Sequence, residues 1–183
     1  RHKNRVVGTH FWNPPYLIPL VEVVRGKHTA DHVMDGTMDL LSRVGKHPVR
    51  VNKDVPGFVG NRLQHALWRE AISIVENGIA DASTVDECVK YGFGLRLPVL
   101  GPMENADLVG TDLTLAIHDY ILGHLERSPA PSGLLKALVA RGDLGVETRP
   151  LRMRLRYQRW VKALETYGKT SRRFPARILA FGC

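Results

Sequence analysis

One histidine and one carboxylate in this sequence are spaced so that they permit proton-transfer chemistry. His10 lies in a β-branched segment at 5–11 and Glu22 in another at 19–24, with a proline-rich turn between them. If these segments pair as antiparallel strands, facing Cβ atoms are about 4.5–5.5 Å apart. A neighbouring carboxylate fixes an imidazole's tautomer and stabilises the imidazolium, which favours His10 as a general base. The alternative is a lone surface or core histidine with an unrelated glutamate.

The elements that must position this pair are strands first and helices afterwards. We predict strands at about 5–11, 19–24 and 48–51, and a helix after Thr29, its expected N-cap, that stops at Gly45. The turn at 52–57 is the best domain boundary. It separates a β-containing part from a helical part.

Four helices are predicted after that turn. They cover 58–77, 83–91 with Ser83 as N-cap, a stretch from near Pro102 to beyond Ile121, and about 133–140 with a stop at Gly142. In the first helix, helical spacing predicts an inward apolar face made by Phe58, Leu63, Leu67, Ala71, Ile74 and Val75.

Composition indicates an ordinary globular protein. The chain has 183 residues, 44% of them hydrophobic and 24% charged, which predicts one domain and possibly part of another. Cys88 and Cys183 show no disulfide or metal-ligand spacing, so no metal site is predicted. No signal peptide and no long apolar run is seen, so we expect a cytoplasmic protein without a membrane span.

The formal charge of +8 comes from the last part of the sequence. Residues 149–183 hold ten Arg or Lys and one acid, whereas residues 1–148 hold sixteen basic and seventeen acidic residues. No specific nucleic-acid partner is predicted, because the body has no basic excess and no recognition motif. A polyanion-binding protein that acts through its basic tail stays open as an alternative function.

Three motifs follow one another along the sequence. The first is His-Phe-Trp-Asn-Pro at 10–14 followed by Leu-Val-Glu-Val at 20–23. The second is Asp-Val-Pro-Gly-Phe-Val-Gly-Asn-Arg-Leu at 54–63, and the third begins Gly-Pro-Met-Glu at 101 and ends at Asp112. In this order the three motifs resemble the 3-hydroxyacyl-CoA dehydrogenase family, and the resemblance covers roughly residues 5 to 148.

The resemblance implies an α/β remnant followed by an all-α region. Residues 1–53 would be the C-terminal part of a Rossmann-like NAD-binding domain. Residues 54–148 would form a helical substrate and dimerisation domain like the C-terminal domain of 6-phosphogluconate dehydrogenase, which implies a homodimer. Residues 149–183 depart from the family and form a basic tail, for which we expect a shifted reading frame or an unrelated fusion.

The resemblance also implies an activity and its residues. His10 matches the catalytic base of an NAD-dependent oxidoreductase, Glu22 its paired carboxylate, and Asn61 the asparagine that hydrogen-bonds substrate. The implied substrate is the 3-hydroxy group of an acyl-CoA, as in fatty acid β-oxidation. A free hydroxy acid or a ring alcohol is the alternative substrate, and a non-catalytic dimerisation fragment is a further alternative. For Asn61 alone, the other interpretation is a cap or turn residue at a helix start.

Two departures from the family pattern bear on the substrate. Trp12 replaces the family's second Phe, and Arg96 lies in a loop at 96–102 that differs from the common one. Arg96 is either a solvated loop residue or a partner for an anionic substrate.

The NAD site itself is expected to lie mainly outside this chain. Gly92-Phe-Gly94 is the nearest approach to a dinucleotide motif, but it follows a helix and lacks the third glycine. We assign no cofactor-binding residue and expect that the sequence begins inside a larger gene product. The chain alone should neither bind NAD measurably nor turn over substrate. Residues 1–52 should be poorly ordered or self-associating, whereas the helical body from Phe58 to about Gly142 should keep a cooperative core.

Overall fold

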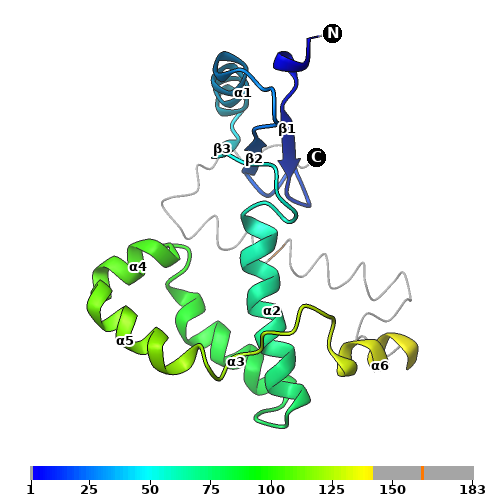
Figure 1. The fold of residues 1–183 in the computed structure, drawn as a ribbon, viewed down its shortest axis with the longest axis vertical. Helices are drawn as coiled ribbons and strands as arrows, with labels where there is room; N and C mark the ends of the chain where they lie inside the picture. Colours follow the sequence, from blue (N-terminus) through cyan, green and yellow to red (C-terminus); the bar gives the residue numbers. More distant parts are fainter. Residues whose placement is uncertain (1, 142–161, 163–183) are drawn as a thin grey trace. The chain divides into compact units, whose positions relative to one another are not determined.

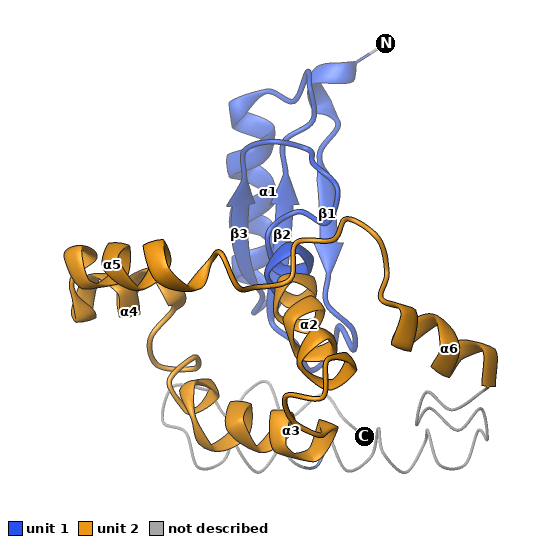
Figure 2. Cartoon of the chain, turned by 60° about the horizontal axis from the view of Figure 1, so that its bottom comes forward, with its two compact units in different colours: residues 1–63, 146–183 blue, residues 64–145 orange. Residues whose placement is uncertain are grey.

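A computed structural model describes residues 2–141 and residue 162. The chain divides into two compact units, one of residues 1–63 with 146–183 and the other of residues 64–145 (Figure 2). The predictions for residues 149–183, and the predicted stop at Gly142, lie outside the described residues apart from Lys162.

The described part of the first unit is a small sheet with one covering helix (Figure 1). A 3₁₀ turn, η1 (Lys3–Arg5), precedes strand β1 (Gly8–Phe11), and strands β2 (Leu20–Val24) and β3 (His47–Val51) complete the order β1-β2-β3. Strands β1 and β2 are antiparallel, whereas β2 and β3 are parallel and joined through helix α1 (Asp31–Arg43). The predicted strands and the Rossmann-like β-α-β connection are therefore confirmed.

The buried core of the described residues lies in this first unit. Val21 and Val23 of β2 and Met34 of α1 are fully buried, and Leu41 of α1 is nearly so. A central strand needs apolar residues on both faces, which explains the continuous Leu-Val-Glu-Val-Val run of β2. The described residues therefore place the buried core in the β-containing part and not in the helical body. The expected poor order of residues 1–52 stays a prediction.

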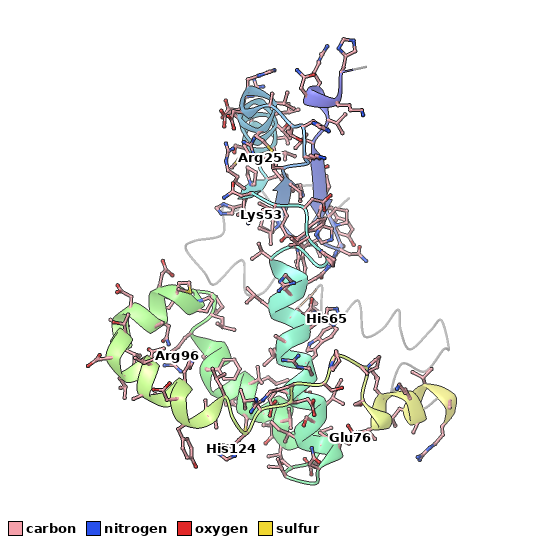
Figure 3. The ribbon with its side chains drawn as sticks, viewed as in Figure 1. Arg25, Lys53, His65, Glu76, Arg96 and His124 are labelled. Carbon is pink, nitrogen blue, oxygen red and sulfur yellow. The ribbon has the colours of Figure 1, made fainter. Side chains whose placement is uncertain are left out.

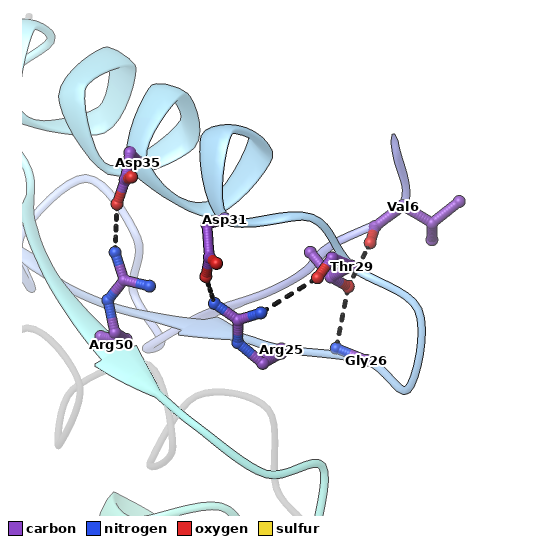
Figure 4. A network of polar contacts seen from close by, with 7 residues as sticks. All are labelled: Val6, Arg25, Gly26, Thr29, Asp31, Asp35 and Arg50. Carbon is purple, nitrogen blue, oxygen red and sulfur yellow. Dashed lines mark hydrogen bonds and ion pairs between the residues drawn. The ribbon is translucent and has the colours of Figure 1, made fainter. Parts of the chain in front are cut away.

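Thr29 ties the N-terminal segment to the loop after β2. Its hydroxyl donates to the Val6 carbonyl at 2.5 Å and accepts from the Gly26 amide at 3.0 Å (Figure 4). The helix begins later than predicted, at Asp31, and Ala30 is its N-cap. Thr29 is therefore not the cap, because two partners outside the helix already occupy its hydroxyl.

Two ion pairs attach α1 to the strands. Arg25, which follows β2, pairs with Asp31, and Arg50 of β3 pairs with Asp35 (Figure 4). Both aspartates are well exposed, so solvent screening leaves each pair little effect on stability. Their main effect is to orient the helix over the sheet.

The turn between β1 and β2 is held by a lysine from the far side of the sheet. Asn13–Pro14 is a cis peptide bond, and the Lys46 ammonium donates to the carbonyls of Pro15 and Ile18. Lys46 lies just before β3. The turn that follows His10 is therefore anchored to the same sheet that carries Glu22.

The remaining described elements are helical. They are α2 (Gly60–Glu76), α3 (Ala82–Tyr91), the 3₁₀ turn η2 (Phe93–Leu95), α4 (Pro102–Val109), α5 (Thr111–Ile121) and α6 (Gly133–Arg141). The four predicted helical stretches are confirmed in outline.

Three of the predicted helix boundaries were wrong. Helix α2 starts at Gly60 because Phe58 has a φ of 45°, outside the right-handed helical region. Asp81 rather than Ser83 caps α3, accepting from the Thr84 amide at 2.7 Å. The predicted helix from Pro102 is two helices, because Gly110 between them has a φ of 105°.

Two glutamates of α2 hold segments of the second unit. The carboxylate of Glu70 accepts from the Glu126 amide at 2.8 Å, and that of Glu76 (labelled in Figure 3) accepts from the Leu134 amide at 2.8 Å. Glu76 thereby supplies the negative charge that the N-terminus of α6 favours. Its contact fixes where α6 begins.

The apolar side chains of these helices are largely exposed. Among residues 60–141 only Ser73 is classed as buried, while Leu63 is 58% and Leu67 is 39% exposed. The predicted inward face of α2 is therefore not covered by the described residues at these two positions.

Candidate active site

The pairing of β1 with β2 brings His10 and Glu22 together. His10 lies directly opposite Glu22 in the antiparallel register, and its Nδ1 is 2.7 Å from Glu22 Oε2. An ionised carboxylate only accepts hydrogen bonds, so Nδ1 carries the proton and Nε2 is the basic nitrogen of the neutral ring. The His10 side chain is 32% exposed, whereas that of Glu22 is 1% exposed. The predicted cross-strand pairing is confirmed, and the catalytic roles stay predictions.

Glu22 is a buried carboxylate with four hydrogen-bond donors. Its Oε2 accepts from His10 and, at 3.3 Å, from the Trp12 indole N–H. Its Oε1 accepts from the backbone amides of Val59 at 2.9 Å and Gly60 at 3.0 Å. A buried charge is costly unless it is fully hydrogen-bonded, and this arrangement meets that requirement.

The two backbone donors come from the start of α2. The first N–H groups of a helix have no partner within the helix and carry the positive end of its dipole, so they bind anions. The first turn of α2 contains no acidic residue of its own. Glu22 therefore acts as its acidic cap from another element. Gly57 and Phe58, with φ of 80° and 45°, turn the backbone into this position.

The surroundings of Glu22 keep it ionised. Burial, the largest single influence, raises the pKa of its carboxyl, but hydrogen bonds from Gly60, His10, Val59 and Trp12 together outweigh burial. The net result is a pKa below the ordinary value for glutamate. An anion is thus held beside the His10 ring.

Aromatic rings lie around the His10 imidazole. The ring of Phe58 has its centroid 5.5 Å from that of His10, and the Trp12 ring has its centroid 5.9 Å from that of His10. These rings come from the loop before α2 and from the residue after β1. They cover part of the imidazole, whose side chain is 32% exposed.

Asn61 follows Gly60 at the start of α2 and is partly buried. Within residues 2–141 no hydrogen bond involves its side-chain amide. Its backbone is thus adjacent to a donor of Glu22, but its proposed contact with substrate stays a prediction.

Three donors to Glu22 were not predicted from the sequence. Trp12 was singled out only as a departure from the family pattern, and nothing in the sequence indicated that its N–H reaches Glu22. The amides of Val59 and Gly60 belong to the second motif. They meet Glu22 only because the turn at 57–58 directs them there.

The glycine-rich stretch after α3 does not form a phosphate cradle. A Cβ on Gly92 would lie 2.3 Å from the Cys88 carbonyl oxygen, and one on Gly94 would lie 2.3 Å from that of Val89. These glycines therefore permit close packing against the end of α3. Arg96, which follows η2, is exposed (Figure 3), and its role toward an anion stays a prediction.

Across residues 2–141 and 162, no group of three or more His, Cys, Asp or Glu side chains is arranged to hold a metal ion. In the same residues, no helix has the length and apolar character needed to cross a membrane.

A histidine on one strand, paired with a buried carboxylate on the next strand that the first amides of α2 also hold, has the geometry of a proton-accepting site. Residues 1–55 match the sequence model of the NAD binding domain of 3-hydroxyacyl-CoA dehydrogenase, and residues 57–150 match that of its C-terminal domain. The chain belongs to the 3-hydroxyacyl-CoA dehydrogenase family. The match also supports NAD as the cofactor of this family member.

Individual relatives have different names. The chain is 35% identical over 147 residues to 5-formyl-3-hydroxy-2-methylpyridine 4-carboxylate 5-dehydrogenase of Mesorhizobium japonicum, covering 80% of this chain and 48% of that protein. It is 47% identical over 120 residues to L-carnitine dehydrogenase of Streptomyces griseus, and this match covers 66% of this chain and 35% of that protein. The chain thus spans about half or less of the length of these relatives.

A solved structure agrees with the fold. The crystal structure of 5-formyl-3-hydroxy-2-methylpyridine 4-carboxylic acid 5-dehydrogenase, described as an NAD⁺-dependent dismutase, matches with a TM-score of 0.81 and 32% identity. The match covers 90% of this chain and 56% of that chain. The β-α-β unit and the helices that follow it are therefore the fold of this family.

Proposed function

We propose that this chain carries the proton-accepting site of an NAD-dependent dehydrogenase that oxidises a hydroxyl group. The observation that supports this most strongly is the 2.7 Å contact between His10 Nδ1 and the buried Glu22 carboxylate. It leaves Nε2 as the basic nitrogen, on a side chain that is one-third exposed. A base in that state is what the oxidation of an alcohol requires.

Each residue then has a distinct part in the reaction. His10 Nε2 takes the hydroxyl proton as the C–H bond of the same carbon breaks. Glu22 holds Nδ1–H and stabilises the positive charge that forms on the ring, which strengthens the interaction as the reaction proceeds. Asn61 is proposed to hydrogen-bond the substrate, as the family pattern implies.

NAD supplies the acceptor for the hydride in this class of reaction. We assign none of its contacts to the described residues, because the one glycine-rich stretch considered for phosphate binding is packed against α3. The described residues are accordingly proposed to contribute the base and its support, and no step is derived through the cofactor.

For the substrate, we favour a small free carboxylate over the acyl-CoA that the family name suggests. The supporting observation is that two relatives are named for a pyridine carboxylate and for carnitine, which is a free hydroxy acid. The exposed Arg96 is a candidate partner for such a carboxylate. Oxidation of a 3-hydroxyacyl-CoA stays the second candidate because of the family match.

We further propose a homodimer that forms through the helical region. Helices α3 to α6 contain no buried residue among those described, yet they carry many large apolar side chains. Monomeric proteins rarely leave that much apolar surface uncovered. A second copy of the helical region is the partner that the family resemblance implies.

Activity is tested in a joined enzyme, in which residues 1–183 follow the N-terminal NAD-binding part of the Mesorhizobium japonicum relative. NADH formation is measured with L-carnitine, other free hydroxy acids, ring alcohols and 3-hydroxyacyl-CoAs of several lengths. We expect turnover with a free hydroxy compound, and its loss in His10→Gln. Turnover that is equal in wild type and His10→Gln would contradict the proposal.

A further inference from the structure

Trp12 is the residue of the site that the family pattern does not account for. It stands where that pattern has a phenylalanine, and its indole N–H donates to Glu22 Oε2 at 3.3 Å. A phenylalanine has no donor. The bond between Trp12 and Glu22 is therefore a feature that this chain adds to the His–Glu pair.

The geometry gives this bond a specific effect on the carboxylate. The terminal torsion of a glutamate is broad and sets no preferred plane by itself. Here the Val59 and Gly60 amides hold Oε1, and Trp12 and His10 share Oε2. With both oxygens held, the plane of the carboxylate is fixed, and one lone pair of Oε2 is directed at His10 Nδ1.

The place for the indole exists because residue 60 is glycine. A Cβ at residue 60 would lie 2.3 Å from Trp12 Cζ2, 3.1 Å from Cε2 and 3.2 Å from Cη2. All three atoms belong to the six-membered ring of the indole. Cζ2 and Cη2 lie at the far end of the indole, and because a phenylalanine side chain is shorter, we expect it to leave more room at residue 60.

We infer that Trp12 is a positioning residue that keeps the Glu22 carboxylate oriented toward His10. Gly60 leaves the space that the Trp12 indole occupies. The two residues act as a pair: one supplies the donor, and the other supplies both the space for the ring and a backbone donor to the second oxygen of Glu22. This inference rests on the proposed function for its catalytic meaning. Its tests do not measure turnover, so the two can fail separately.

The contacts around Glu22 make a clean titration experiment possible. His10 is the ionisable group that contacts Glu22, and its other partners are neutral N–H donors from Trp12, Val59 and Gly60. In the full chain, the Glu22 carboxyl carbon and the Trp12 indole N–H are followed by NMR as the pH is lowered. We expect both signals to move with one midpoint, while the Trp68 indole does not follow it. If the chemical shift of the Trp12 indole N–H does not change as Glu22 becomes protonated, the inference is overturned.

Trp12→Phe removes the donor and keeps an aromatic ring. We expect the Glu22 carboxyl to titrate at higher pH than in wild type, because one hydrogen bond to its ionised form is lost. We also expect a smaller share of His10 rings with the proton on Nδ1, measured from the ring nitrogen shifts. Trp68→Phe on α2, where the indole contacts His65, is the control. Wild-type values for both readouts in Trp12→Phe would refute a positioning role.

Substitutions at Gly60 and Trp12, singly and together, test whether the indole needs a glycine at residue 60. Gly60→Ala should displace the indole and speed hydrogen exchange at the Val59 and Gly60-position amides, which donate to Glu22. Adding Trp12→Phe should restore slow exchange, because the shorter side chain leaves more room at residue 60. If Gly60→Ala is equally damaging with Trp12 and with Phe at position 12, the two residues are not a matched pair.

Discussion

At the scale of single residues, His10 is the group on which the chemistry depends. In the joined enzyme, His10→Gln should lower kcat by roughly 10²–10⁴-fold, the loss typical of removing a general base. The affinity for NAD should change little, because no NAD contact is assigned to His10 and the glutamine side chain fills much of the same space. Stopped-flow measurement of NADH formation gives kcat, and fluorescence titration gives the affinity.

The matched control for that substitution is His65→Gln. His65 lies on α2, where its ring packs edge-on against Trp68, and it is not one of the hydrogen-bond partners of Glu22. It should leave kcat unchanged. A similar loss in both variants would mean that removing any imidazole disturbs the fold.

Glu22 makes the stability of the first unit depend on pH. Its pKa is lowered in the folded chain, so its contribution is present above the unfolded pKa of about 4.3 and is lost as the pH falls through the folded value. Urea unfolding of the sheet should therefore show a falling midpoint on acidification. Glu22→Gln should be less stable at neutral pH and should flatten that dependence.

Glu87→Gln is the control for the pH experiment, since Glu87 is exposed on α3. It should keep the wild-type dependence of the sheet on pH. Equal pH dependence in wild type and Glu22→Gln would show that other groups govern acid unfolding.

At the scale of elements, the break between α4 and α5 depends on Gly110. Its φ of 105° is rarely adopted by residues with a side chain, and a Cβ would lie 2.8 Å from Asp112 Oδ1. Gly110→Ala should destabilise the helical region by about 1–3 kcal/mol, the cost of a strained backbone conformation. Hydrogen exchange of the α4 and α5 amides measures the effect locally.

Gly123→Ala, shortly after α5, is the comparison. A Cβ there would meet nothing closer than 3.9 Å, and its φ is not in the positive region. It should be neutral or slightly stabilising. Equal exchange in the two variants would mean that the conformation at Gly110 is not required.

Particular elements show what the sequence could predict. The pairing of β1 with β2 followed from two β-branched segments around a proline turn, and the register places His10 opposite Glu22. The break at Gly110 was missed because apolar residues continue at helical spacing through it. Thr29 was taken for a cap because local rules favour it, but contacts with Val6 and Gly26 use its hydroxyl instead.

Part of the candidate site could likewise be predicted from the sequence, and part could not. The His–Glu pair is local to one hairpin, so spacing showed that it was possible, and the family resemblance selected it over a lone histidine with an unrelated glutamate. The N–H groups of Val59 and Gly60 reach Glu22 through the path of the chain after β3, and no local pattern encodes that path. The Trp12 bond further depends on the space left at Gly60, which is a property of packing.

At the scale of the whole molecule, apolar surface on the helices predicts self-association. Leu67 of α2 is 39% exposed and Leu115 of α5 is 62% exposed. Light scattering should give the mass of two chains for the protein, and Leu67→Glu with Leu115→Glu should give one, because buried charges oppose an apolar interface. Leu40→Glu on α1, at a position 53% exposed, is the control and should leave the dimer intact. A monomeric wild-type chain would contradict the proposed homodimer.

The coupling between His10 and Glu22 tests the central claim most directly. In the joined enzyme, kcat is measured for wild type, His10→Gln, Glu22→Gln and the double variant. Residues that act as a unit are strongly non-additive, so the double variant should be little worse than His10→Gln alone. Losses that multiply fully would show that Glu22 does not act through His10, and the proposed site would then be wrong.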